Sequence, residues 1–405
     1  MRAGGRYPSS RSTEPGLSSP STRLAATIHP TTRTLLLYTK ANFLHRAILA
    51  KMTSQLQNDS MRFGFYDKTF ANHDSVIVAD DLPLSFQGQV LTVGNFDGVH
   101  RGHTELLRQS CELADILNTK VTAITFDPHP LQLLDLARFQ PPLTTIAERC
   151  YLLCRSGADQ VLVLQTTSEL LKMSAICFFE EIIMKRLRCT GLVEGFNFRF
   201  GHGRLGSLDL LRELCQSHAL PFREVSEFQL DGQTVSSSSV RHAIVSGDLV
   251  RARELLGRSY RLEGRVGRGA ARGRTLGYPT ANLEDVPTVL PAPGVYAVLA
   301  RTENRLWPAA ANIGPNPTFD DNRMKIEVHL IGFQGELHGQ KISVEFIEKI
   351  RDTMRFNSRE ELVQQLNHDV KICQKLIVSI SGELKHGRNE SPRTGGTGDS
   401  IAHRT

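Results

Sequence analysis

The sequence predicts an α/β domain built on a parallel sheet, followed by an antiparallel β-barrel or sandwich that ends in a helix. Its 405 residues suit two or three domains of roughly 150 residues each. From Val76 to about Gly257, short apolar runs alternate with helical patterns. From Tyr260 to about Ile350, short strand-like segments are separated by Gly/Pro turns instead, which is typical of an antiparallel barrel or sandwich.

Each element follows from a local pattern. In the first domain, we expect strands at 90–93, 121–126, 161–164 and 191–193, and helices at 105–117, 146–154, 176–187 and 208–218. Their alternation predicts helices on both faces of the sheet. In the second domain, we expect strands at 295–300, 325–331 and 341–347. A last helix is expected over 358–380, with Ser358 as its N-cap and Glu361 completing a capping box.

These elements divide the chain into four segments. We predict a disordered or targeting extension at 1–60, a first domain at 75–257, a second domain at 258–382 and a disordered tail at 386–405. An Arg- and Ser-rich, acid-poor extension is typical of an organellar transit peptide. The alternative is a disordered extension upstream of a true start at Met52 or Met61. The expected location is cytoplasmic under the second interpretation and organellar under the first.

The charge and cysteine content exclude several classes of function. Residues 1–51 hold eight basic residues and one acidic residue, whereas the remainder holds 40 basic and 41 acidic residues. A nearly neutral folded region argues against a nucleic-acid partner. No apolar run reaches the ~18 residues that a membrane span needs, so no membrane partner is expected. Seven cysteines without a Cys-x-x-Cys motif fit free thiols in a reducing compartment.

A first candidate site lies in residues 90–104, VLTVGNFDGVHRGHT. A strand ends there in a glycine-rich turn that leads into a helix, and such a turn favours a bound phosphate. His100 and His103 can donate hydrogen bonds to phosphate oxygens, and Gly102 permits close approach of the backbone. The alternatives are a capping turn with exposed histidines, or a zinc site, although no third ligand lies nearby.

Three later segments support a phosphate site. ITFDPHP (124–130) and VEGFNFRFGHGRLG (193–206) again place a polar turn after a strand. In VSSSSVR (235–241), the hydroxyls and Arg241 suit a polyphosphate, whereas a flexible linker is the alternative interpretation of the serine run.

In this order and spacing, GNFDGVHRGH, TFDPHP, GFNFRFG and SSSSVR resemble the FMN adenylyltransferase module of bacterial bifunctional riboflavin kinase/FAD synthetases. The resemblance implies a Rossmann-like nucleotidyltransferase domain in which His100 and His103 contact the ATP phosphates and stabilise transfer at the α-phosphate. The other implied ATP or phosphate ligands are Gly94, Phe96, Asp97, Gly102, Asn197, Ser237, Ser238 and Arg241. The implied flavin ligands are Asp127, Pro128 and Phe198. Glu194 and Phe196 depart from the family pattern, which has a small apolar and a polar residue there.

A second candidate site begins with residues 263–283, EGRVGRGAARGRTLGYPTANL. We expect a mobile glycine-rich loop whose N–H groups cradle phosphates, with an RNA-binding segment or a solvated loop as alternatives. Thr280 and Asn282 supply hard oxygen donors for Mg²⁺. In 325–333, strand alternation puts Glu327 and His329 on one face. A carboxylate near a Mg–ATP loop is a candidate general base, and an ordinary surface residue is the alternative.

Together with PGVY, NIGPNPTF, EVHL, HGQKISVEF and IRDTMRFNS, this segment resembles the riboflavin kinase module, an antiparallel β-barrel with a C-terminal helix. The resemblance implies that Thr280 and Asn282 bind Mg–ATP as metal ligands. It implies that Glu327 accepts the proton of the riboflavin 5′-hydroxyl. The remaining implied contacts are Gly269 and Gly273 to ATP, and Arg351 and Phe356 to the flavin. His338 departs from the tyrosine that is usual in the family.

The two resemblances predict a bifunctional enzyme that phosphorylates riboflavin to FMN and then adenylylates FMN to FAD, releasing pyrophosphate. The expected cofactor is Mg²⁺, with ATP and the flavins as substrates and products and at most a weak homo-oligomer. Three rival hypotheses are a monofunctional FAD synthetase, a nucleic-acid-binding protein using the 261–274 segment, and a nucleotidyltransferase for another phosphate. Intact Thr280, Asn282 and Glu327 argue against the first, the neutral folded region against the second, and the kinase resemblance against the third.

Overall fold

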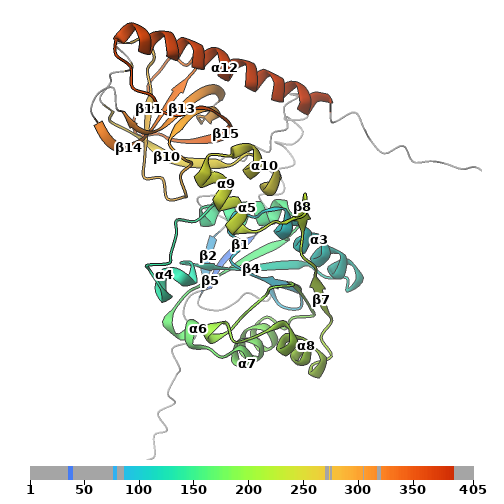
Figure 1. Cartoon of the computed structure of the whole chain (residues 1–405). Helices are drawn as coiled ribbons and strands as arrows, with labels where there is room; N and C mark the ends of the chain where they lie inside the picture. The colour runs from blue at the N-terminus through green and yellow to red at the C-terminus, as the bar shows by residue number, and fades with distance from the viewer. Residues whose placement is uncertain are drawn as a thin grey trace, which may run out of the picture.

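The computed structural model describes residues 35–39, 76–79, 86–269, 273, 276–303, 305–316 and 321–386. It forms an α/β lobe and a barrel lobe with a long helix along the barrel (Figure 1), as the predicted fold class requires. Most of the predicted 1–60 extension and nearly all of the 386–405 tail lie outside the described residues. Among the described residues, no helix is both long and apolar enough to cross a membrane. All seven cysteines are free thiols, as expected.

The α/β lobe contains a seven-stranded sheet with the order β2-β1-β5-β4-β3-β6-β7. Its parallel strands are β3 (Val90–Val93), β4 (Val121–Asp127), β5 (Gln160–Gln165), β6 (Gly191–Gly195) and β7 (Phe222–Val225). At the edge beyond β5, β1 (Leu35–Thr39) and β2 (Val76–Ala79) pair antiparallel. The strand order reverses between β3 and β6, so the loops after these two strands flank the topological switch point where open α/β sheets bind ligands.

Helices cover both faces of this sheet, as predicted. On one face, α3 (Arg101–Ile116) and α5 (Ile146–Arg155) bury Leu107 and Leu153 against the strands. The opposite face is covered by α7 (Ala175–Cys177), the π-helical segment η2 (Phe178–Arg186) and α8 (Leu208–Ser217). Shorter elements complete the lobe, namely α4 (Pro130–Leu134), α6 (Ser168–Lys172), η3 (His202–Arg204), β8 (Gln229–Leu230) and β9 (Gln233–Thr234).

Two helices, α9 (Ser237–Ser246) and α10 (Leu249–Leu256), lie between the lobes (Figure 1). The sequence assigns both to the first domain. Their apolar residues, among them Ile244 and Leu255, nevertheless belong to the same buried cluster as the barrel interior. Leu143 of the α/β lobe joins that cluster too. The two lobes therefore share one apolar core at their junction.

The second lobe is a closed antiparallel barrel with the strand order β10-β11-β14-β13-β12-β15. The strands are β10 (Arg261–Gly267), β11 (Ala281–Glu284), β12 (Gly294–Arg301), β13 (Leu306–Asn316), β14 (Asp321–Leu330) and β15 (Lys341–Arg351). Outside the barrel, α12 (Arg359–His386) packs Cys373 and Ile377 against β12 and β15. Ser358 is confirmed as its N-cap, because its hydroxyl accepts from the Glu361 N–H at 3.1 Å. The Glu361 carboxylate accepts from the N–H of Asn357, the residue before the N-cap, instead of the Ser358 N–H that the predicted capping box requires.

One expectation is wrong in part. The stretch 263–283 does not form a single loop, because β10 runs to Gly267 and β11 starts at Ala281. Alternate residues of β10, including Leu262 and Val266, are buried in the barrel. Glycines and arginines between those apolar positions conceal the strand pattern in the sequence.

Candidate active sites

The loop after β3 is tightly wound. Phe96, Gly98 and Val99 have φ values of 48°, 83° and 40°. Positive φ is an outlier for a β-branched residue such as Val99, and such strain persists only where the surroundings hold it. Phe96 is buried beneath Gly94, and its ring meets His103 edge-on with the centroids 5.2 Å apart. The loop delivers His100 as the N-cap residue of α3.

The two histidines stack at the start of α3, with their ring centroids 3.7 Å apart. Neither buried Nδ1 atom has a hydrogen-bond partner among the described residues. Burial, and next the charge of Arg258, lower the pKa of His100 to about 4. Burial, followed by the charges of His100, Arg149 and Arg258, also lowers the pKa of His103 well below its ordinary value. Both imidazoles are therefore neutral at pH 7, and their unpartnered nitrogen atoms are suited to a ligand.

Gly102 lies where two helices begin. A Cβ at this position would be 3.2 Å from the His100 ring and 3.4 Å from the carbonyl oxygen of Val235, just before α9. The His100 ring and the residue before α9 thus lie close to the Gly102 backbone, whereas the close approach of that backbone to a ligand stays a prediction. The first turns of α3 and α9 converge here, and their free N–H groups favour an anion.

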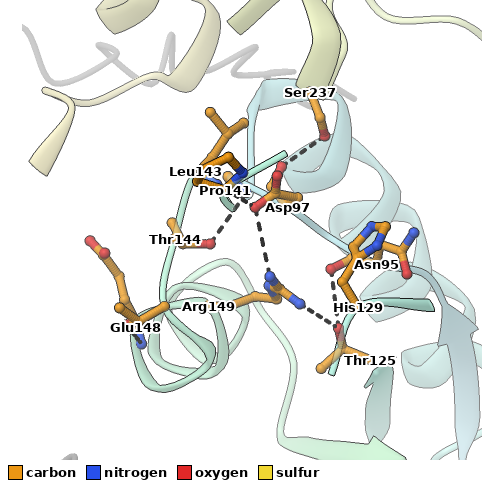
Figure 2. Close-up of polar contacts among 12 residues, drawn as sticks. Asn95, Asp97, Thr125, His129, Pro141, Leu143, Thr144, Glu148, Arg149 and Ser237 are labelled. Carbon is orange, nitrogen blue, oxygen red and sulfur yellow. Dashed lines mark hydrogen bonds and ion pairs between the residues drawn. The ribbon is translucent and has the colours of Figure 1, made fainter. Parts of the chain in front are cut away.

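Asp97 lies between three segments of the α/β lobe (Figure 2). Its Oδ1 accepts from the Leu143 N–H at 2.8 Å and lies 3.6 Å from Nη2 of Arg149. Its Oδ2 is 2.8 Å from Nη2 of Arg241, and its carbonyl accepts from the Ser237 hydroxyl at 2.8 Å. Asp97 thus connects the histidine loop with α5 and α9, and its carboxylate is occupied by protein groups.

The serine run serves two purposes. Ser236 and Ser239 form a capping box that starts α9, so these two hydroxyls are engaged in the helix cap. Ser237 donates to Asp97, and Ser238 is exposed at the helix N-terminus. Of the four serines, Ser238 is exposed to solvent, whereas the other three are half-buried.

Arg149 and His129 are site residues that the sequence analysis missed (Figure 2). Arg149 is 4% exposed and donates to Thr125 at the end of β4, besides its ion pair with Asp97. His129 follows β4, accepts from the Leu131 N–H, and has its pKa lowered chiefly by burial. An arginine on the buried side of α5 was the available signal, because such a charge needs a partner.

The TFDPHP segment also places its predicted flavin ligands at the end of β4. Asp127 and Pro128 are joined by a cis peptide bond, and Thr166 binds both carbonyl groups. Burial raises the pKa of the Asp127 carboxyl, and the charge of Arg149 opposes that rise. The segment is therefore fixed next to β5 and the arginine on α5.

The loop after β6 forms the other side of the switch point. Asn197 is exposed there, and the Phe198 ring stacks on Phe200 with the centroids 5.4 Å apart. Glu194 at the end of β6 is buried, and its Oε1 accepts from the Val93 N–H at 2.7 Å. Burial raises the pKa of Glu194 well above its ordinary value. This departure from the family pattern therefore links β6 to the end of β3.

In the barrel, the glycine-rich segment lies against β11. A Cβ at Gly269 would overlap the amide of Asn282, and one at Gly273 would overlap the carbonyl of Tyr278. Only glycine permits this approach. Nδ1 of His329 on β14 lies 2.8 Å from the carbonyl oxygen of Pro279, and the His329 ring meets the Tyr278 ring edge-on. Strand β14 therefore holds the end of this segment.

Three polar residues form a row across neighbouring barrel strands. Glu327 on β14 pairs with Asn282 on β11 and with Asn312 on β13. Directly paired residues share a face, and their neighbours Ala281 and Val328 are buried inside, so the row faces outward. Asn312 was missed, although it begins the NIGPNPTF motif.

The donor set fits Mg²⁺ bound together with phosphates. Thr280 lies two residues before Asn282. Its hydroxyl is close to Gly273, because a Cβ added at Gly273 would be 3.4 Å from the Thr280 Oγ1. Hydroxyl, amide and carboxylate oxygens are the ligands that Mg²⁺ prefers. The described residues contain no group of three or more His, Cys, Asp or Glu that would hold a metal alone.

Arg351 and Phe356 lie beside each other near the end of β15. The Arg351 guanidinium makes a forked ion pair with the buried Asp369 of α12, at 2.8 Å, and its carbon is 5.8 Å from the Phe356 ring centroid. The sequence analysis missed Asp369. The ion pair fixes Arg351 between β15 and α12.

Comparisons with known proteins agree with this geometry. The FAD synthetase family model matches residues 83–239, and the riboflavin kinase model matches residues 256–377. The bifunctional riboflavin kinase/FMN adenylyltransferase of Escherichia coli K12 is 38% identical over 285 residues, covering 70% of this chain and 91% of the relative. The Haemophilus influenzae protein of the same name is 35% identical, covering 72% and 96%. A solved structure titled macrolide-efflux protein, from Streptococcus pneumoniae, is 31% identical with a TM-score of 0.64, covering 71% and 94%.

Proposed function

Because the chain belongs to the family of bifunctional riboflavin kinase/FMN adenylyltransferases, we propose that each lobe carries one of its two reactions. The chain makes FAD from riboflavin by way of FMN. The observation that carries the division is that the first family match, 83–239, contains His100 and His103, and the second, 256–377, contains Thr280, Asn282 and Glu327. The barrel site then makes FMN, and the α/β site makes FAD.

In the barrel, the riboflavin 5′-hydroxyl attacks the γ-phosphorus of ATP. A neutral hydroxyl is a weak nucleophile, so Glu327 accepts its proton. The glycine segment around Gly269 and Gly273 binds the phosphates through backbone N–H groups. Thr280 and Asn282 would hold Mg²⁺, which neutralises phosphate charge when bound. Arg351 orients Phe356 toward the flavin.

In the α/β lobe, a phosphate oxygen of FMN attacks the α-phosphorus of a second ATP, and pyrophosphate leaves. That nucleophile is already an anion, so no protein base is required. His100 and His103 donate their N–H groups to the phosphate oxygens. Ser238 and Arg241, at the start of α9, bind the leaving pyrophosphate, and Ser237 positions that helix through Asp97.

The remaining predicted ligands of the α/β lobe fall into groups by the loop that carries them and the substrate that they contact. Gly94 and Phe96 shape the loop after β3, and Asn197 reaches the nucleotide from the loop after β6. Asp127, Pro128 and Phe198 bind the flavin. Asp97 acts through Arg149 and Arg241 and not as a phosphate ligand, because a carboxylate repels phosphate and both of its oxygens already have partners.

The test follows products by chromatography after incubation with ATP and Mg²⁺, with either riboflavin or FMN supplied. We expect FAD from both. Glu327→Gln should lower FMN formation by about 10²–10⁴-fold but retain FAD formation from supplied FMN, and His103→Ala should do the reverse. Loss of both activities in a folded variant would contradict the division. The cytoplasmic location and the weak homo-oligomer stay predictions, and sedimentation velocity of the full chain tests the latter.

A further inference from the structure

The backbone just before His100 is held by an arginine from outside the α/β domain. Arg258 lies between α10 and β10, within the segment that matches the riboflavin kinase model. Its Nη1 donates to the Val99 carbonyl at 2.9 Å, and its Nη2 donates to the Gly98 carbonyl at 2.6 Å. One guanidinium therefore binds two consecutive carbonyls in the strained loop.

The loop needs such a partner. Gly98 and Val99 have positive φ and lie beyond the end of β3 at Val93, so the β-ladder supplies no partner for their carbonyls. The planar guanidinium offers two donors at fixed spacing, which a lysine ammonium does not. Gly257 ends α10 in the left-handed conformation, at φ 72°, immediately before Arg258. The chain thus turns back toward the α/β lobe at this residue.

Arg258 also contributes charge to the histidine pair. Burial lowers the pKa of Arg258 to about 10, whereas the charge of Glu148 acts to raise it. Arg258 therefore stays charged at pH 7. Glu148 is itself buried and forms an ion pair with Arg261 of β10 at 3.1 Å. The charged groups that lower the pKa of the histidines are Arg258 and, from α5, Arg149.

We propose that Arg258 is a positioning residue for adenylyl transfer. Through Arg258, the kinase half of the chain holds the loop before His100, and so fixes the positions of His100 and His103. This inference rests on the proposed function of the histidine pair. It implies that the α/β domain alone, cut before Arg258, has an incomplete adenylyltransferase site. The shared core around α9 and α10 keeps the two halves together so that this contact persists.

The test compares Arg258→Met, which removes the charge and the fork, with Arg258→Lys, which retains the charge only. The matched control is Arg251→Met on α10, where the arginine pairs with Asp231 and Glu254 at the surface. In both Arg258 variants, we expect kcat for FMN adenylylation to fall about tenfold to a hundredfold, because small misplacements cost this much. KM for FMN and riboflavin phosphorylation should stay unchanged, and the control should retain both activities.

A second readout separates positioning from general stability. NMR titration of the histidine rings should show the pKa of His100 rising above about 4 in Arg258→Met, though only part of the way to its ordinary value because burial is the larger cause, and staying low in Arg258→Lys. Unchanged adenylylation in either variant would overturn the proposal. Equal loss of both activities in both variants would also overturn it, because Arg258 would then only support the fold. If His103→Ala leaves adenylylation intact, the proposed function of the histidines fails first, whatever the Arg258 variants do.

Discussion

Replacing Asp97 by asparagine should destabilise the α/β lobe more than it weakens ATP binding. The asparagine keeps the shape and one acceptor for the Leu143 N–H, but it removes the negative charge that faces Arg149 and Arg241. The substitution thus isolates the charge of Asp97 from its size. It also distinguishes the observed contacts from the sequence-based prediction that Asp97 is a phosphate ligand.

The magnitude follows from the burial of the two arginines. Arg149 is 4% exposed, whereas Arg241 is 18% exposed. Removing one partner of a buried ion pair costs about 3–5 kcal/mol, because the other charge stays buried without compensation. The lower end applies here, since Arg241 still reaches solvent. A loss of about 3 kcal/mol lowers Tm by roughly 6–12 °C in a domain of this size.

Differential scanning calorimetry measures the transition of the α/β lobe, and FMN adenylylation at varied ATP gives KM and kcat. The matched control is Asp135→Asn, because Asp135 is 38% exposed and lies 3.8 Å from Arg138 on the surface. That pair should contribute at most about 1 kcal/mol. We expect Asp97→Asn to lower Tm and kcat with little change in KM for ATP. A Tm equal to that of the control, together with a raised KM for ATP, would show that Asp97 faces the nucleotide.

The remaining predictions concern single groups. Glu327→Gln should lower riboflavin phosphorylation by about 10²–10⁴-fold, the usual contribution of a general base, in an assay of FMN release. Gly269→Ala should raise KM for ATP in the same assay, because its Cβ overlaps the Asn282 amide, while FMN adenylylation serves as the internal control. Burial raises the pKa of Glu194 in the folded state, so the protonated carboxyl favours folding. This contribution to the free energy of unfolding is present below the ordinary pKa of 4.5 and is lost as pH rises through the raised pKa. Glu194→Gln retains an acceptor for the Val93 N–H. Its free energy of unfolding in urea should therefore equal that of the wild type at low pH and exceed it at neutral pH. A difference between the two that does not change with pH would contradict this.

The sequence predicted those elements whose signal is local. The strand at 90–93 and the helix starting at Ile146 agree with the structure, because apolar runs and helical spacing determine them. In contrast, β13 (Leu306–Asn316) went unrecognised because it contains two prolines and a glycine, which usually interrupt a strand. Barrel closure places these residues in the ladder regardless of their propensity.

Site residues show the same limit. His100, His103 and Glu327 could be predicted because their motifs are contiguous in sequence. Arg149 and Asp369 were missed, since their partners Asp97 and Arg351 lie far away along the chain and are brought near only by folding. The contacts of Asp97 with Arg149 and Arg241 could not be predicted for the same reason. A carboxylate inside a phosphate-binding motif resembles a ligand until the arginines that neutralise it are located.

The two sites differ in construction because their nucleophiles differ in charge. An FMN phosphate needs no base, so the α/β site can bury neutral imidazoles in a strained loop and surround them with arginines that favour anions. Riboflavin offers a neutral hydroxyl, so the barrel site needs a carboxylate, and a carboxylate must be kept away from phosphate by an intervening cation. The outward row of Glu327, Asn282 and Asn312, with Gly269 close to Asn282, is where we propose that such a cation binds. Under the proposed division, each lobe therefore meets the requirement of its own nucleophile.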